Sequence, residues 1–187
     1  MELVTRQTVI ENYLHYDSRK KNLPLPENLT EWDWSDPNEL DIQLIKHGYK
    51  SGILAGYLYW KPVELGRSEL SQCAIYAGIF PPTLPRVLEQ LIGCPAFESW
   101  KPDRDVEWFI PLEQGQAYPR DWPLILRPAV KSEHPATLYL EDGSGRGLCF
   151  FRKLVRSNDN SRKAFGYLGV TPDPKSTFMQ QRFPSLL

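Results

Sequence analysis

The stretch Thr137-Leu-Tyr-Leu-Glu-Asp-Gly-Ser-Gly-Arg-Gly-Leu-Cys-Phe-Phe-Arg152 decides how this sequence is interpreted. An apolar run that favours a β-strand ends at Leu140, a polar turn covers Glu141–Gly145, and Gly147–Val155 is predicted to be a helix. Two glycines before a helix allow backbone N–H groups to point at one spot, and Arg146 adds a planar cation. The stretch therefore predicts a strand, a turn and a helix that together can hold an anion such as phosphate.

The composition of the turn also fits a purely structural role. Asp-Gly and Ser-Gly pairs are ordinary in a β-turn that has no ligand. In addition, Glu141 and Asp142 would repel an anion unless a cation such as Mg²⁺ lay between them. If the turn does bind phosphate, the sequence predicts a metal-facing role for Glu141 or Asp142.

Other short apolar runs, bounded by turn residues, predict a small mixed sheet around this stretch. They are Val106–Ile110, Leu124–Leu126 and Ala164–Val170. The segment Lys101–Asp105 is charged and contains a proline, which suits a boundary or a long loop. The residues after Thr171 are rich in proline and polar side chains, which is typical of a segment that lies on the surface.

Residues 1–100 are predicted to be mainly helical, and they contain no recognisable catalytic constellation. The fold class that we predict is therefore α+β, with a helical region over 1–100, a small mixed-sheet core over 101–170 and a surface tail over 171–187. Gly52–Trp60 is compatible with a helix or a strand, which Lys61-Pro62 would end. The predicted helices are Glu2–Lys21, one that starts at Ser35 or Asp36 with Pro37 in its first turn and ends near Gly48, Arg67–Ile79, and Thr83–Ile92.

The overall composition is that of an ordinary globular protein, with 41% hydrophobic and 24% charged residues in a chain of 187. The net charge of −1 gives no global attraction to nucleic acid. The cysteines, Cys73, Cys94 and Cys149, are widely spaced and form no C-x-x-C pair, so neither a disulfide framework nor a zinc site is indicated. The chain has no leader pattern and no apolar run near the roughly 18 residues that a membrane span needs. We therefore expect a cytoplasmic protein that has no membrane partner.

Two further features resemble a known superfamily. The run Leu126-Arg127-Pro128, followed by Leu138–Arg146 and a helix, resembles the core signature of the ParB/sulfiredoxin-like superfamily. In that family a strand leads into an Asp-Gly-x-His/Arg-Arg or Gly-Cys-His-Arg turn at a helix N-terminus. Ile110-Pro111-Leu112 and Tyr118-Pro119-Arg120 are similar to the family's opening strand and its proline-arginine turn. The resemblance covers Val106–Val155 and implies a ParB/sulfiredoxin-like fold for the C-terminal half.

The resemblance assigns roles to individual residues. Asp142 and Gly143 match the start of the family's turn, and Ser144 takes the position of the reactive cysteine of sulfiredoxin-like members. Arg146 matches the arginine that holds phosphate groups, and Arg120 matches an upstream arginine that faces the nucleotide. The family includes ATP- and CTP-dependent proteins, so the resemblance implies a nucleotide ligand.

This sequence departs from the family pattern at two positions. Gly145 replaces the usual histidine or arginine, which removes one phosphate contact. Ser144 replaces cysteine, and a serine hydroxyl without an adjacent base is a poor nucleophile, which counts against sulfiredoxin activity. We predict a protein that binds a nucleotide or another phosphate, with ATP or CTP and Mg²⁺ as cofactor, and the pattern does not decide whether the nucleotide is turned over. The predicted phosphate-binding residues are Arg120, Asp142, Gly143, Ser144, Gly145 and Arg146, and Glu141 and Asp142 are the candidates to face the metal.

A first alternative is a non-enzymatic protein-interaction module. Six tryptophans are enough to supply anchors for an interface, where aromatic side chains contribute much of the binding energy. In this interpretation the turn is only structural and a protein partner docks on aromatic-rich faces. These faces surround five of the six, Trp32, Trp34, Trp60, Trp100 and Trp122.

A second alternative is a DNA-binding accessory protein. A run of basic residues follows the turn and its helix, and such a run can follow a phosphate backbone if its members share one face. A solvated helix face and loop would have the same composition. The basic residues are Arg152, Lys153, Arg156, Arg162 and Lys163.

Overall fold

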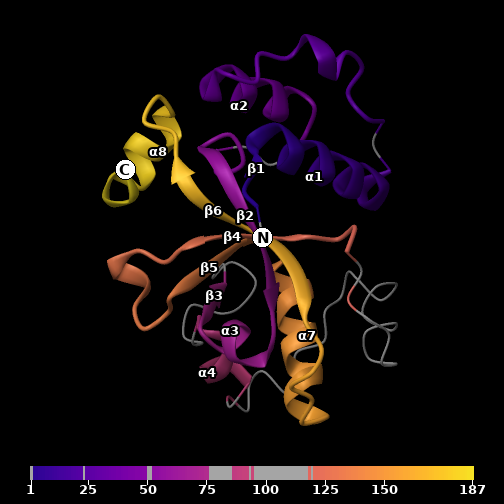
Figure 1. Ribbon diagram of the computed structural model, residues 1–187, viewed down its shortest axis with the longest axis vertical. Coiled ribbons are helices and arrows are strands. Elements are labelled where there is room, and N and C mark those ends of the chain that lie inside the picture. Colours follow the sequence, from indigo (N-terminus) through magenta and orange to yellow (C-terminus); the bar gives the residue numbers. More distant parts are fainter. Residues whose placement is uncertain are drawn as a thin grey trace. The chain divides into compact units, whose positions relative to one another are not determined.

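The structure is a computed structural model that describes residues 2–22, 24–49, 52–75, 86–92, 94, 118 and 120–187, without the side chains of Lys20 and Lys21. Within these residues the chain forms six helices and a six-stranded mixed sheet (Figure 1). The helices are α1 (Arg6–Lys21), α2 (Pro37–Lys46), α3 (Arg67–Ser71), α4 (Leu88–Ile92), α7 (Ser144–Arg156) and α8 (Thr177–Arg182). The strands are β1 (Val4–Thr5), β2 (Tyr57–Leu65), β3 (Cys73–Ile75), β4 (Leu124–Pro128), β5 (Leu138–Asp142) and β6 (Ala164–Pro172).

The strand order in the sheet is β1-β2-β6-β4-β5-β3. Strands β4 and β5 are antiparallel, with Leu126 opposite Leu140, and β1 is antiparallel to β2. Strand β3 runs parallel to β5, with Ala74 opposite Tyr139. The protein is therefore a mixed α/β structure, which is compatible with the predicted α+β class.

The chain divides into two compact units. The first consists of Met1–Pro62 and Tyr167–Leu187, and the second is the continuous segment Val63–Gly166. The chain passes from one unit to the other within β2 and again within β6. Gly143, which we call the glycine turn, joins β5 to α7, and all three belong to the second unit.

Local signals explain the helices of the first unit. The side chain of Thr5 accepts a hydrogen bond from the Thr8 N–H at the start of α1, and Asn22 ends the helix in the left-handed conformation. Asp36 caps α2 by accepting from the N–H groups of Asn38 and Glu39, and Pro37 stands in the first turn. The predicted start of α2 is thus confirmed.

The C-terminal segment contributes to the core of the first unit. The Asp173 carboxylate accepts a hydrogen bond from the Arg6 guanidinium, and both side chains are only 3% exposed. Met179, on α8, is fully buried. The residues after Thr171, which the sequence places in a surface tail, thus include a short helix and a buried ion pair.

In the second unit, α7 follows β5 directly and covers the sheet with an apolar face. Leu148, Phe150, Phe151 and Leu154 of this helix are all buried. Helices α3 and α4 pack against α7 and against each other, as Figure 1 shows within this unit. The predicted helix Gly147–Val155 is confirmed, and it begins three residues earlier, at Ser144.

Several predicted elements are wrong in part. The predicted helix Glu2–Lys21 begins only at Arg6, because Val4–Thr5 pairs with β2 as strand β1. The predicted turn Glu141–Gly145 is reduced to Gly143, because β5 extends to Asp142 and α7 begins at Ser144. The predicted helix Arg67–Ile79 stops at Ser71, because Cys73–Ile75 pairs with β5 as the buried strand β3. Strand β2 continues through Lys61-Pro62 to Leu65, so this dipeptide does not end the element. On the side of β1 the pairing reaches Trp60, so Pro62 has no partner residue in β1 that would need its missing N–H.

Some predictions lie outside the described residues. They include the strand Val106–Ile110, the Ile110-Pro111-Leu112 motif and the boundary Lys101–Asp105. Of the predicted helix Thr83–Ile92, the structure describes residues 86–92, of which Leu88–Ile92 form α4.

Candidate anion site at the glycine turn

Gly143 joins β5 to α7 in the left-handed conformation, with φ 83° and ψ 18°. A Cβ atom at this position would lie 2.6 Å from Cδ2 of Leu124 and 2.8 Å from Nη2 of Arg146. Backbone strain and lack of space therefore both require glycine here. This residue sets the direction in which the first turn of α7 points.

The first turn of α7 is accessible at one residue. Gly145 is half-buried, whereas Gly143, Ser144 and the residues from Arg146 to Phe151 are buried. The Ser144 hydroxyl donates a hydrogen bond of 3.1 Å to the Leu140 carbonyl, so it is directed at the preceding strand. An incoming ligand would therefore meet the backbone of the turn at Gly145.

Arg146 lies in the interior of the second unit. Its side chain is 3% exposed, and its Nη2 donates to the Pro123 carbonyl and to Oδ2 of Asp142, each at 3.1 Å. Burial raises the pKa of Tyr118, and the charge and hydrogen bond of Arg146 offset part of this effect. Arg146 thus ties the start of α7 to the chain that enters β4.

A second arginine, Arg127, is shared by the carboxylates of Glu141 and Glu133. The Arg127 Nε lies 2.5 Å from Oε1 of Glu141, and its two terminal nitrogens donate to Glu133 at 2.7 and 2.6 Å. The guanidinium also lies 4.2 Å from the centre of the Tyr139 ring. Burial opposes the charge of Arg127, yet the hydrogen bonds and charges of Glu133 and Glu141 raise its pKa.

Both carboxylates that the sequence offers to a metal therefore have an arginine partner. Asp142 pairs with Arg146, and Glu141 pairs with Arg127. In the described part of the chain, no group of three or more His, Cys, Asp and Glu side chains is arranged to hold a metal ion. Arg127 is shared with Glu133, so the two arginines offset two of the three carboxylates around the turn.

Arg120 has a different environment from Arg146. Its side chain is 83% exposed, and its Nη2 lies 3.4 Å from Oε1 of Glu64. Lys163 approaches the same carboxylate, with Nζ 3.9 Å from Oε2 of Glu64. The described ion pair of Arg120 is thus with β2 and not with the turn, and two exposed cations share one acid there.

The sequence reasoning missed Arg127 and Tyr118 as parts of this site. A signal for Arg127 was present, because a charged residue within the apolar run Leu124–Pro128 requires partners when the strand is buried. Tyr118 donates a hydrogen bond of 2.8 Å to the Trp122 carbonyl, and no sequence pattern indicates that contact.

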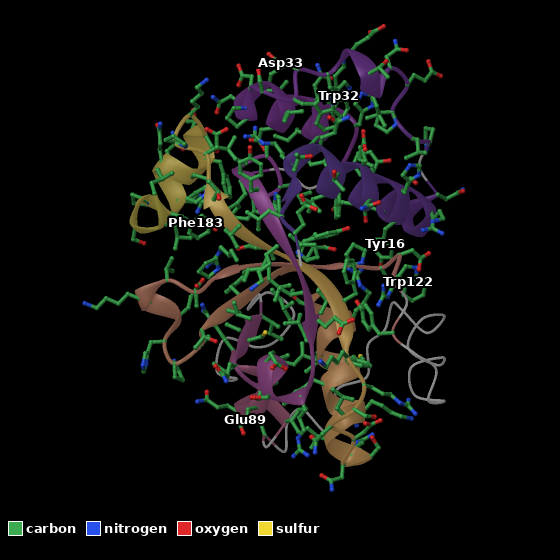
Figure 2. All side chains as sticks on the ribbon, in the orientation of Figure 1. Tyr16, Trp32, Asp33, Glu89, Trp122 and Phe183 are labelled. Atoms are coloured by element: carbon green, nitrogen blue, oxygen red, sulfur yellow. The ribbon has the colours of Figure 1, made fainter. Side chains whose placement is uncertain are left out.

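The tryptophans of the interaction hypothesis are not all at the surface. Trp60 is fully buried, and Trp32 is 9% exposed and stacks on His47, with 6.0 Å between ring centres. Trp34 and Trp122 are half-buried, and Figure 2 marks Trp32 and Trp122. Trp100 lies outside the described residues.

The basic residues of the DNA hypothesis occupy the last turns of α7 and the loop that follows. Two of them have acidic partners, because Arg162 pairs with Asp159 at 3.0 Å and Lys163 approaches Glu64. Arg156 is exposed, whereas Arg152 and Lys153 are half-buried. These pairings reduce the positive charge that this region offers to a nucleic acid.

Comparisons with known proteins found no matching family model, no matching curated protein and no matching solved structure. Among the helices that the structure describes, none has the length and apolar character that crossing a membrane requires. The geometry of the site is therefore the basis for the functional proposal.

Proposed function

We propose that the chain binds an anion at the N-terminus of α7, and that the phosphate groups of a nucleotide such as ATP or CTP are its ligands. One observation carries the proposal. This helix of 13 residues begins after a left-handed glycine, and within the described residues it has neither a side-chain cap nor an acidic residue in its first turn. Its first N–H groups therefore meet an approaching anion without competition from a capping side chain.

The charges around the turn support this proposal without a metal. A bare Glu141 and Asp142 would repel an anion, but each of them has an arginine partner at 2.5 and 3.1 Å. Arg127 also pairs with Glu133, so the two arginines offset two of the three nearby carboxylates, and the partial positive charge of the helix N-terminus adds to them. We expect these charges together to bind inorganic phosphate without Mg²⁺, which would act only on the outer phosphates of a nucleotide.

The two arginines take different roles in the proposal. Arg146 positions the turn, because its guanidinium is buried against Asp142 and the Pro123 carbonyl. Arg120, which is 83% exposed, is the side chain that can leave Glu64 and contact a phosphate outside the turn. Ser144 and Gly145 contribute their backbone N–H groups.

The variant Gly145→Asp tests the proposal. It places a carboxylate in the first turn of α7, where the carboxylate competes for the helix N–H groups and repels an anion. Gly145→Asn is the matched control, because it has nearly the same size and no charge. Thermal unfolding is measured with inorganic phosphate, ATP or CTP, each in EDTA and in Mg²⁺.

A ligand at about 100 times its dissociation constant adds about 2.7 kcal/mol of stability, which appears as a shift of several degrees. We expect this shift for the natural chain and for Gly145→Asn, and its loss in Gly145→Asp. Equal shifts in all three proteins would place the anion elsewhere. The absence of a shift with any of the three ligands would reject the proposal.

The second candidate function is protein interaction, and α2 carries it. Ile42 and Ile45 of this helix are 58% and 59% exposed, and their spacing of three places them on one face. The opposite face of α2 buries Leu40 and Leu44. An exposed aliphatic pair on a rigid helix fits a partner helix with an apolar stripe.

Substitution on this face tests the interaction function. Immobilised natural chain, the double variant Ile42→Lys/Ile45→Lys and the control Gln43→Lys are used to capture proteins from the source cells. A partner retained by the natural chain and the control, but lost from the double variant, would support the candidate. Identical captures from all three would exclude α2 as the docking surface.

A further inference from the structure

A pocket of about 460 Å³ lies in the second unit among α3, α4 and the C-terminal half of α7. Its volume is within the range of pockets that bind small molecules, which is roughly 300–1,000 Å³. It is lined by residues of the second half of α7, whereas the glycine turn lies at the other end of that helix. This pocket is therefore a different site from the one proposed above.

The lining of the pocket combines an apolar floor with two opposite charges. Phe151, Val155 and Ile92 supply apolar surface, and Phe151 is 2% exposed. Arg67 supplies a cation, and Glu89 supplies an anion. Figure 2 labels Glu89 on α4, where its side chain lies at the surface of the unit.

The cation is held in place by the end of α7. Nη1 of Arg67 donates a hydrogen bond of 3.0 Å to Oδ1 of Asn158. Asn158 is itself fixed in the left-handed conformation, with φ 50°, just after α7 ends. The other N–H groups of the planar Arg67 guanidinium are therefore held at the pocket, in an arrangement that suits a carboxylate.

The combination of charges selects the chemical class of the ligand. A phosphate or a nucleic acid backbone would meet the carboxylate of Glu89, which repels it. A simple apolar molecule would make use of neither charge. A zwitterion with an apolar group would use all three features, with its carboxylate on Arg67, its ammonium group on Glu89 and its apolar group on the half-buried Ile92 and Val155.

We infer that this pocket binds a free α-amino acid that has a large apolar side chain. L-Phenylalanine is the probe, and two derivatives separate the charges. N-acetyl-L-phenylalanine lacks the ammonium charge, and L-phenylalanine amide lacks the carboxylate. Binding is followed by NMR titration of the backbone amides of Val155 and Asn160, both of which line the pocket.

Two variants give opposite patterns. Glu89→Gln should weaken L-phenylalanine binding roughly tenfold and leave N-acetyl-L-phenylalanine unaffected, because one charge-assisted hydrogen bond is lost. Arg67→Gln should weaken L-phenylalanine to a similar degree and leave L-phenylalanine amide unaffected. Glu27→Gln, an exposed acid in the first unit, is the control and should not change binding.

Glu89 is exposed, so Glu89→Gln should leave the fold intact. The test therefore does not depend on a substitution that could unfold the protein. Saturable shifts at Val155 and Asn160 that respond to the two variants in this way would establish the site. No shifts at about 10 mM L-phenylalanine, or equal effects of Glu89→Gln on all three ligands, would overturn the inference.

Discussion

Replacement of Arg146 by methionine tests whether this arginine positions the turn or waits for a phosphate. Methionine keeps much of the aliphatic shape and removes every hydrogen bond of the guanidinium. Asp142 then loses its partner at 3.1 Å, and the Pro123 carbonyl loses a donor at the same distance. The structure therefore predicts a large loss of folding stability even without any ligand.

The magnitude follows from burial. Removal of one partner from a buried ion pair costs about 3–5 kcal/mol of folding stability. Because 17% of the Asp142 side chain is exposed, water can solvate part of its charge, which reduces the expected loss to about 2–4 kcal/mol. For a chain of this size that loss lowers the unfolding temperature by roughly 5–15 °C. The control Arg120→Met removes an exposed arginine, and its effect should stay below about 0.5 kcal/mol.

Urea unfolding followed by circular dichroism measures both variants against the natural chain. A free energy of unfolding for Arg146→Met within about 1 kcal/mol of the natural value would refute the positioning role. It would return Arg146 to the role of a phosphate contact, which the sequence resemblance implies.

Three further outcomes are expected. Gly143→Ala should destabilise the protein by about 2–4 kcal/mol, because it combines a left-handed alanine with a clash against Leu124, and a loss below about 1 kcal/mol would show that the turn can relax. Burial raises the pKa of the Cys73 thiol to about 12, above its ordinary value of 9.0. The stability that the neutral folded thiol contributes is therefore present below pH 9 and is lost as the pH rises towards 12. Cys73→Ala should flatten this alkaline decline of the free energy of unfolding in urea, and an unchanged decline would contradict the buried-thiol explanation. Arg6→Met should cost about 3–5 kcal/mol because it leaves the buried Asp173 carboxylate without its partner, and the double variant Arg6→Met/Asp173→Leu should recover part of that loss.

The sequence predicted those elements that local signals determine. The start of α2 follows from an aspartate cap and a proline in the first turn, and both are visible in consecutive residues. The helix α7 follows from its apolar spacing and from the glycine before it. In each case the residues that decide the structure are neighbours in the chain.

Long-range pairing explains the main error in the helical region. Cys73–Ile75 continues a helical pattern in the sequence, but these residues form β3 because they pair with Leu138–Leu140 in parallel register. Burial in a sheet decides their conformation, and their intrinsic preference does not. The sequence alone does not show that partner.

The site shows the same limit at the level of side chains. The sequence indicates that Gly143 turns the chain and that Arg146 follows it, and the structure has both at the start of α7. The sequence does not indicate that the Arg146 guanidinium hydrogen-bonds to the Pro123 carbonyl, or that Arg127 contacts Glu141. Composition predicts the chemistry of a group, whereas the packing around it decides where the group points.

An NMR titration of the natural chain tests whether the first turn of α7 binds an anion through its backbone. A hydrogen bond to a phosphate oxygen moves an amide proton downfield. We expect saturable downfield shifts of the Ser144 and Gly145 amides on addition of inorganic phosphate, ATP or CTP, with Val155 unaffected. Unchanged amide signals at these two residues at about 10 mM of each ligand would show that the anion does not bind there.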